Sequence, residues 1–208
     1  MSFPVDLISP FFPLLIFGSF FLIVPLAFFF GWRGRVKREA ELSRFARNHG
    51  LFFKKGGFFS LAKAIGNYKG FDIVLRARNR GSNGPIETEL LMFYDKRSGV
   101  EVKRSLFSLP KHYLSCVCQS FLRKSFNGSS KEFNDVFSTR GDLARQVLTP
   151  EVQHLMLELN KIKRFHLRVD VPKNGGGVVT VRTQGKDCLD DIFLTRALEL
   201  AVLVSKKM

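Results

Sequence analysis

An uninterrupted apolar run over residues 11–30 (FFPLLIFGSFFLIVPLAFFF) constrains this chain more than any other feature of its sequence. The run carries no charge, and in a helix with about 1.5 Å of rise per residue its length matches a hydrocarbon core of about 30 Å. A secretory signal peptide would instead begin with basic residues and have a shorter apolar stretch. We therefore expect a transmembrane helix over residues 11–32, preceded by a short extracytoplasmic tail at residues 1–10.

The charges on the two sides of this run differ in sign. The tail contains Asp6 and neither Lys nor Arg, whereas Arg33, Arg35, Lys37 and Arg38 follow the run closely. Flanks rich in Lys and Arg stay in the cytoplasm. The sequence therefore predicts a single-pass protein of the cell membrane or an organelle inner membrane, with its N-terminus outside and its C-terminal domain in the cytoplasm.

Two residues of the predicted span have expected roles of their own. Trp32 lies where an aromatic side chain is expected at the membrane interface. Pro25 lies inside the span and should kink it, because a proline within a helix removes one backbone hydrogen bond. We expect this kink to be a tolerated bend in a simple anchor; the alternative is a packing feature against another membrane protein.

A strongly basic segment follows the span. Residues 31–63 contain nine Lys or Arg and two Glu, which is a local net charge of +7 within a chain total of +15. Residues 33–50 are expected to form a basic juxtamembrane helix, and the segment as a whole is expected to contact the bilayer, with its anionic lipids, or a membrane protein partner. Nucleic acid is not expected, because the strongest cluster lies directly beside the membrane. The expected contact residues are Trp32, Arg33, Arg35, Lys37, Arg38, Arg44, Arg47, Lys54 and Lys55.

The remaining residues, 51–208, predict one soluble α+β domain of antiparallel sheet and packed helices. Alternating apolar residues and turn signals predict three strands that form a meander and, later, a second hairpin. The three strands are expected at residues 71–78, 86–94 and 100–109, and the hairpin at residues 165–171 and 178–183.

Helices are expected at residues 111–124, from Thr149 onward, and at residues 187–206. The second of these has the clearest signal, because Thr149 can cap the helix and Pro150 suits its first turn. The third has acidic residues at its start and Lys206 and Lys207 at its end, as the helix dipole favours.

Three short patches resemble uncharacterised prokaryotic single-pass proteins that carry a small α+β domain behind a membrane anchor. The patches are residues 66–70 (GNYKG) leading into a strand, residues 132–137 (EFNDVF) and residues 148–151 (LTPE). The resemblance covers roughly residues 35–205. It implies the fold and the anchoring, and since the family has no assigned activity it implies no reaction.

Candidate catalytic and ligand-binding patterns are weak in this sequence. The four His residues have no metal-ligand spacing, and Asp190 and Asp191 would diverge by about 100° on a helix. The glycines at residues 175–177 lead into a strand and not into a P-loop helix. Cys116 and Cys118 are expected to be buried free thiols on one helix. No catalytic residue, metal or cofactor is therefore expected.

These observations favour a non-catalytic, membrane-anchored accessory or scaffold subunit that binds and stabilises a larger membrane protein complex. The alternative is a membrane-tethered cytoplasmic domain that binds a ligand or has a regulatory role. An enzyme without a recognisable motif is the third option.

Overall fold

The computed structural model describes Ile23, Leu26, Phe29 and Arg33 and, beyond these, residues 35–57, 61–79, 86–94, 112–118, 129–172, 176–184 and 189–208. The chain divides into two compact units, Met1–Ala40 and Glu41–Met208. Among the described residues, no helix is both long and apolar enough to cross a membrane. Of the predicted span at residues 11–32, only three single residues are described, and Pro25 and Trp32 lie outside the described part.

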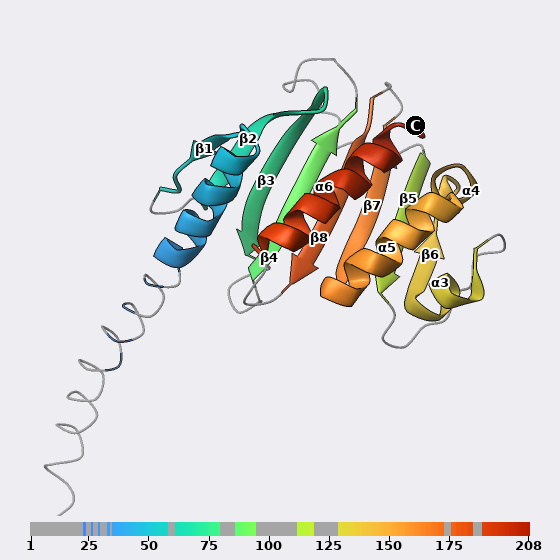
Figure 1. Ribbon diagram of the computed structural model, residues 1–208, viewed down its shortest axis with the longest axis horizontal. Coiled ribbons are helices and arrows are strands. Elements are labelled where there is room, and N and C mark those ends of the chain that lie inside the picture. The colour runs from blue at the N-terminus through green and yellow to red at the C-terminus, as the bar shows by residue number, and fades with distance from the viewer. Residues whose placement is uncertain are drawn as a thin grey trace, which may run out of the picture. The chain divides into compact units, whose positions relative to one another are not determined.

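The second unit is built on one antiparallel sheet, so the predicted α+β class is confirmed (Figure 1). The sheet has eight described strands, in the order β1-β2-β3-β4-β8-β7-β5-β6. The strands are β1 (Phe52–Lys54), β2 (Lys63–Tyr68), β3 (Phe71–Asn79), β4 (Ile86–Phe93), β5 (His112–Cys118), β6 (Phe137–Arg140), β7 (Phe165–Val171) and β8 (Val178–Gln184).

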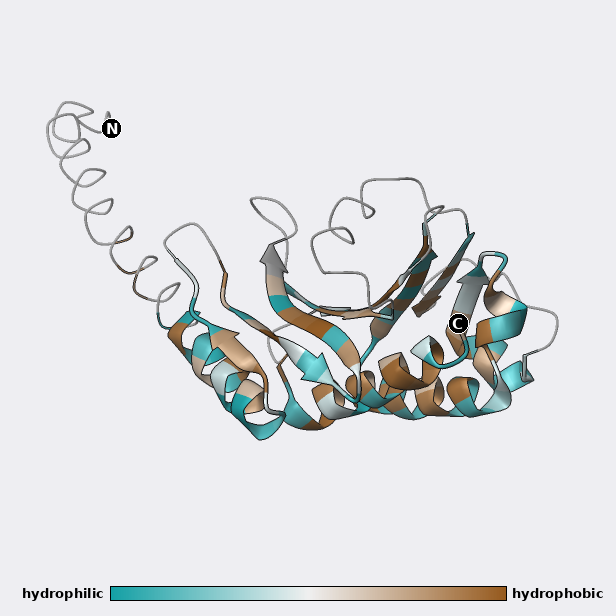
Figure 2. Ribbon diagram, turned by 90° about the horizontal axis from the view of Figure 1, so that it is seen from above, coloured by the Kyte–Doolittle hydropathy of each residue, from teal (hydrophilic) through white to brown (hydrophobic). Residues whose placement is uncertain are grey.

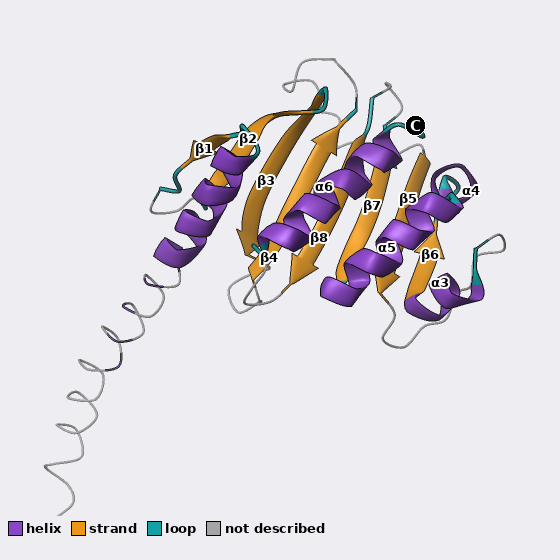
Figure 3. Cartoon of the chain, in the orientation of Figure 1, coloured by secondary structure: helices purple, strands orange, loops and turns teal. Residues whose placement is uncertain are grey.

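Helices cover one face of this sheet, which we call the helix face (Figures 2 and 3). The labelled helices are α3 (Lys131–Val136), α4 (Ala144–Val147), α5 (Pro150–Ile162) and α6 (Asp191–Ser205). A further helix covers residues 35–48, and from Glu41 onward it belongs to the same compact unit as the sheet. The opposite face of the sheet, called the second face below, carries the charged side chains described in the next subsection.

The core lies between the sheet and these helices. One row of side chains crosses six strands on the helix face, and each member is at most 2% exposed. Its members are successive register partners: Ala64, Leu75, Leu90, Val181, Leu167 and Cys116. Phe165 and Phe193 lie edge to face over this layer, with ring centroids 6.3 Å apart. Burying each large side chain stabilises the fold by about 2 kcal/mol.

The helix at residues 35–48 contributes to this core. Leu42, Phe45 and Ala46 are each at most 2% exposed and belong to the same cluster as the sheet residues. The sequence predicted a separate basic helix at residues 33–50 in front of the domain. In the structure, the compact unit therefore begins ten residues before the predicted start at residue 51.

Local signals identified several elements correctly. The hairpin of β3 and β4 and the hairpin of β7 and β8 are both present and antiparallel. The Thr149 hydroxyl accepts a hydrogen bond from the backbone N–H of Val152, and Pro150 is the first residue of α5. The C-terminal helix expected at residues 187–206 is present as α6 over Asp191–Ser205, and its cap is Asp190, whose carboxylate accepts from the backbone N–H of Ile192 at 2.9 Å.

Two sequence predictions are wrong. Residues 112–118, expected within a helix, form strand β5. Leu114 and Cys116 are fully buried while Tyr113 and Val117 are exposed, which is the two-residue period of a strand. The predicted meander is the second, because β4 pairs with β3 and β8 and so has no free edge for a third strand. That residues 100–109 form a strand stays a prediction, since they lie outside the described residues.

The hairpin of β2 and β3 was not predicted, although its turn is visible in the sequence. Tyr68 and Phe71 are register partners, so Lys69 and Gly70 alone form the turn. Both have positive φ, at 50° and 88°. This is the backbone of a tight hairpin turn, and glycine adopts it without the steric cost of a Cβ atom.

Candidate functional site

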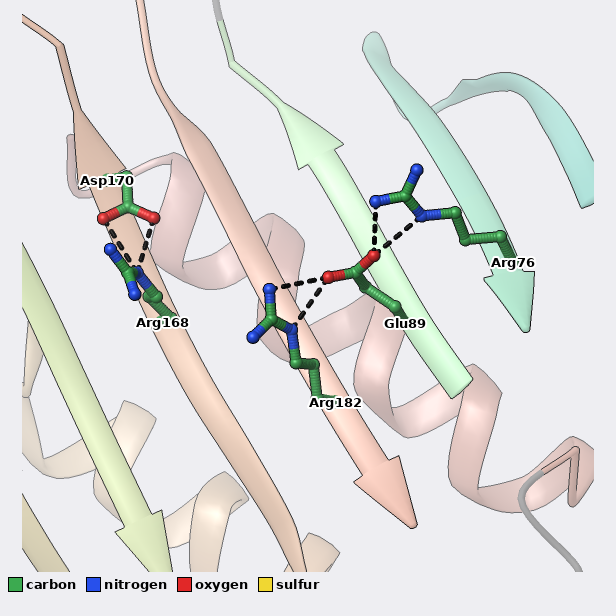
Figure 4. Close-up of polar contacts among 5 residues, drawn as sticks. All are labelled: Arg76, Glu89, Arg168, Asp170 and Arg182. Atoms are coloured by element: carbon green, nitrogen blue, oxygen red, sulfur yellow. Dashed lines mark hydrogen bonds and ion pairs between the residues drawn. The ribbon is translucent and has the colours of Figure 1, made fainter. Parts of the chain in front are cut away.

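The second face of the sheet carries a buried carboxylate between two arginines (Figure 4). Glu89 on β4 is the register partner of Arg76 on β3 and of Arg182 on β8. Arg76 donates from Nε at 2.7 Å and from Nη2 at 2.6 Å to one carboxylate oxygen. Arg182 donates from Nε at 2.8 Å and from Nη2 at 2.7 Å to the other oxygen. Each carboxylate oxygen thus receives two charge-assisted hydrogen bonds, which are the stronger class.

Glu89 is the buried member of this group. Its side chain is 1% exposed, whereas those of Arg76 and Arg182 are 44% and 31% exposed. Burial raises the pKa of Glu89, but the hydrogen bonds and positive charges of the two arginines outweigh burial and hold the pKa below the ordinary glutamate value. The carboxylate is therefore ionised at neutral pH, and the three side chains together carry one net positive charge.

A second ion pair lies further along the same face. Arg168 and Asp170 are two positions apart on β7, so their side chains point to one side of the strand. Arg168 donates from Nε to both oxygens of Asp170, at 2.9 and 2.7 Å. Figure 4 shows this pair and the Glu89 group on neighbouring strands of one sheet face.

His166 lies beside these ion pairs. Its Nε2 atom is 2.9 Å from the hydroxyl oxygen of Ser115 on β5. Burial lowers the pKa of His166, and the positive charges of Arg182 and Arg168 lower it further. The imidazole is therefore neutral at physiological pH. His166 alternates along β7 with Phe165 and Leu167, which are both buried, so it points to the opposite face of the sheet.

A hydroxyl within hydrogen-bond distance of a neutral imidazole is the geometry of a nucleophile and its base. Catalysis of that kind also needs a group that orients the ring and donors for a developing oxyanion. In the described part of the chain, His166 Nδ1 has no such orienting partner, and Ser115 lies in mid-strand within a regular ladder. The contact therefore fits a polar cross-strand pair better than a catalytic dyad.

The two described cysteines, Cys116 and Cys118, are not activated as nucleophiles. Cys116 and Cys118 are free thiols, as predicted, but they lie on strand β5 and not on a helix. Burial raises the pKa of Cys116 to about 12, and the Cys118 pKa is raised by burial as well. Both groups are protonated at neutral pH and so are poor nucleophiles. Cys188 lies outside the described residues.

The adjacent acids Asp190 and Asp191 border a surface hollow that Glu41 and Arg44 also line. The Asp190 carboxylate already caps α6, since it accepts a hydrogen bond from the backbone N–H of Ile192. Asp191 lies in the first turn of the helix, where an acid suits the helix dipole. Among the described residues, no three His, Cys, Asp or Glu side chains are grouped as metal ligands would be.

The basic residues expected to contact the membrane divide between the two compact units. Arg33 is exposed, and Arg35 donates from Nε to Glu39 at 3.1 Å within the first unit. Those of the second unit all lie at the surface: Arg44, Arg47, Lys54 and Lys55. Of the aromatic side chains in the same segment, Phe45 is in the core, whereas Phe52 is 71% exposed.

Sequence reasoning did not identify the charged groups of the second face. Glu89 lies in a strand (IETELLMF) whose alternation was recognised, and a glutamate facing away from the core would ordinarily be solvated. Its two arginines lie 13 positions before it and 93 positions after it. Only the sheet order brings all three together.

No protein family model, curated protein or solved structure matches this chain. The resemblance to membrane-anchored α+β proteins therefore stays a prediction. Function is inferred below from the residues and their contacts.

Proposed function

We propose that this chain is a non-catalytic accessory protein, anchored by residues 11–32, whose α+β domain binds and stabilises a larger membrane protein complex on the cytoplasmic side. The apolar run supports the anchor, and the excess of Lys and Arg after it supports the orientation. The polar groups of the second face support a non-catalytic role, because both oxygens of Glu89 and both oxygens of Asp170 are already occupied by arginines.

The observation that carries this proposal is the short distance in sequence between the apolar run and the folded domain. The run ends at Phe30, and the compact unit begins at Glu41, eleven positions later. Eleven residues span about 16 Å as a helix and at most about 40 Å when extended. A domain of this size is about 30–40 Å across. An anchor at residues 11–32 would therefore hold the domain within about its own diameter of the bilayer, where its partners would be membrane proteins.

The test is co-purification of the full chain after extraction in a mild detergent. We expect it to resist alkaline extraction from membranes and to elute with a membrane protein in fixed stoichiometry. A variant in which residues 11–30 are replaced by an unrelated apolar segment of equal length should keep that partner if the domain makes the contact. Recovery of the chain as a monomer would contradict the accessory role and favour the ligand-binding alternative. Release by alkaline extraction would contradict the anchor.

A further inference from the structure

Three cations stand side by side on the second face at the β1 edge of the sheet. Lys54 on β1 is the register partner of Lys63 on β2, which is the register partner of Arg76 on β3. Directly opposed residues on neighbouring antiparallel strands have Cβ atoms about 5 Å apart, and like charges at this spacing repel one another. The sequence did not single out Lys63 or Arg76, because their proximity depends on strand pairing.

The acids of the described chain do not neutralise this row. Neither Lys54 nor Lys63 forms an ion pair with a described residue, and Arg76 shares the single carboxylate of Glu89 with Arg182. Within this one row of register partners, from Lys54 to Arg182, four cations therefore accompany one anion. Because the repulsion among them opposes folding, an anionic partner that binds this edge would relieve it.

An apolar row runs directly beside the cations on the same face. Phe52, Ile65 and Val74 are successive register partners. Phe52 is 71% exposed, although its neighbour Phe53 packs against the core. An aromatic side chain next to a row of Lys and Arg is the composition of surfaces that lie on anionic bilayers, where the ring enters the interface and the cations meet lipid headgroups.

We propose that this corner of the sheet, made of Phe52, Lys54, Lys63, Ile65 and Arg76, binds the surface of an anionic bilayer. The proposal rests on the proposed function in one respect: the anchor keeps the domain close enough to the membrane for a weak surface contact to form. With the anchor in place the domain is already held beside the bilayer, so its effective concentration there is high. A few cations and one aromatic ring then suffice to dock it. Docking would fix which faces of the domain remain available to a protein partner.

The experiment uses the full chain reconstituted into vesicles, with Phe52→Trp as the reporter in a Trp32→Phe background. Because position 52 is exposed, the substitution leaves the core unchanged. In vesicles with anionic lipid, the emission of the indole at position 52 should shift to the blue and be quenched by brominated lipid chains. Zwitterionic vesicles should give neither effect. Raising the salt from 0.1 M to 1 M should reverse the effect, because the screening length falls from about 10 Å to about 3 Å.

Charge substitutions then test the cation row itself. Each cation near an anionic leaflet changes binding about five-fold, so Lys54→Gln with Lys63→Gln should lower the ratio of docked to undocked domain about 25-fold. Lys206→Gln with Lys207→Gln is the matched control, since it removes two exposed cations at the end of α6 and should leave quenching unchanged. Thermal unfolding followed by circular dichroism confirms that each variant is folded.

Several results would overturn the inference. One is equal quenching in anionic and zwitterionic vesicles. Another is a loss of quenching in the Lys206→Gln, Lys207→Gln control as large as that in the Lys54→Gln, Lys63→Gln variant. A third is a blue shift produced by an acidic polypeptide or RNA but not by anionic lipid. If the chain remains integral to the vesicles while the indole stays in water, only this inference fails. If the chain does not insert at all, the proposed function fails first.

Discussion

At the scale of single residues, Glu89 is a buried carboxylate that two arginines hold on the second face. Its carboxylate is removed from water, and its hydration is replaced by four hydrogen bonds from two partly exposed guanidinium groups. Removing one partner of a buried ion pair is costly because the remaining charge is left uncompensated. Here the two arginines would also be left close to one another on neighbouring strands of the sheet.

We therefore expect Glu89→Gln to lower the free energy of unfolding by about 2 kcal/mol, below the full cost of breaking a buried pair because the arginines are partly solvated. Glu199→Gln is the control, since Glu199 pairs with Arg196 on the surface of α6, where an ion pair contributes about 0.5 kcal/mol or less. Urea unfolding of both variants measures the difference. Equal losses would show that the Glu89 group adds nothing beyond a surface pair.

The pKa of Glu89 also predicts an acid dependence of stability. Because the folded pKa lies below the unfolded value, the unfolded chain binds the proton first as the pH falls. The stabilisation is present above the ordinary glutamate pKa and is lost as the pH drops toward the lowered one. Urea unfolding between pH 6 and pH 3 should show a steeper loss for the wild type than for Glu89→Gln. Parallel curves would contradict the lowered pKa.

His166 predicts a separate effect at higher pH. Its folded pKa is lowered, so below about pH 6.5 the unfolded chain gains a proton that the folded chain does not. Stability should therefore fall as the pH drops from 7.5 to 5.5, and His166→Gln should reduce that fall. His154, which is exposed on α5, provides the control substitution His154→Gln. A pH profile that His166→Gln leaves unchanged would contradict this assignment.

At the scale of elements, the helix at residues 35–48 combines two roles. From Glu41 onward one side of it packs into the core through Leu42, Phe45 and Ala46, while Arg44 and Arg47 remain exposed. Apolar residues at positions i, i+3 and i+4 form such a stripe. From Glu41 onward the helix is therefore part of the domain and not only a linker to the residues that precede it.

Phe45 and Phe52 give a direct test of that role. Phe45 is 2% exposed in this helix, and Phe52 is 71% exposed on β1. Phe45→Ala should lower the free energy of unfolding by about 3–4 kcal/mol, because it removes buried apolar surface and leaves a cavity. Phe52→Ala should change the free energy of unfolding by at most about 0.5 kcal/mol. Thermal or urea unfolding decides between them. Similar losses for both would mean that the helix does not pack as described.

At the scale of the whole molecule, truncation tests where the domain begins. A chain that starts at Glu41 keeps the helix residues of the core and should unfold cooperatively. A chain that starts at Leu51 lacks the core residues Leu42, Phe45 and Ala46. Its free energy of unfolding should be lower by about 5 kcal/mol, enough to unfold many domains of ordinary stability. Thermal unfolding of the two chains, followed by calorimetry or circular dichroism, measures the cooperativity and stability of each. A cooperative, equally stable chain from Leu51 would remove the helix from the folding unit.

Membrane topology is the other prediction at this scale. The asymmetry of Lys and Arg around residues 11–30 predicts that the C-terminus is cytoplasmic. A reporter that works only in the cytoplasm should therefore be active when it is fused after Met208. A cysteine introduced in residues 1–10 should be labelled by an impermeant reagent from outside. The reverse pattern, with the reporter outside and the tail protected, would contradict the proposed orientation.

The sequence alone determined those elements whose signals are local. The Thr149 cap and the alternation in β3, β4, β7 and β8 lie within a few residues of the structures they specify, so they could be read before any contact was known. The same reasoning failed for β5, where a short apolar run did not distinguish a strand from a helix.

Tertiary structure decided everything that depends on pairing between distant segments. The placement of β8 beside β4 excludes the predicted meander and brings Arg182 to Glu89 across 93 positions of sequence. The pairing of β1, β2 and β3 aligns Lys54, Lys63 and Arg76 into one row. No local pattern encodes such neighbours, because strand order is set by the burial of the whole helix face, and the charges of the second face follow from that order.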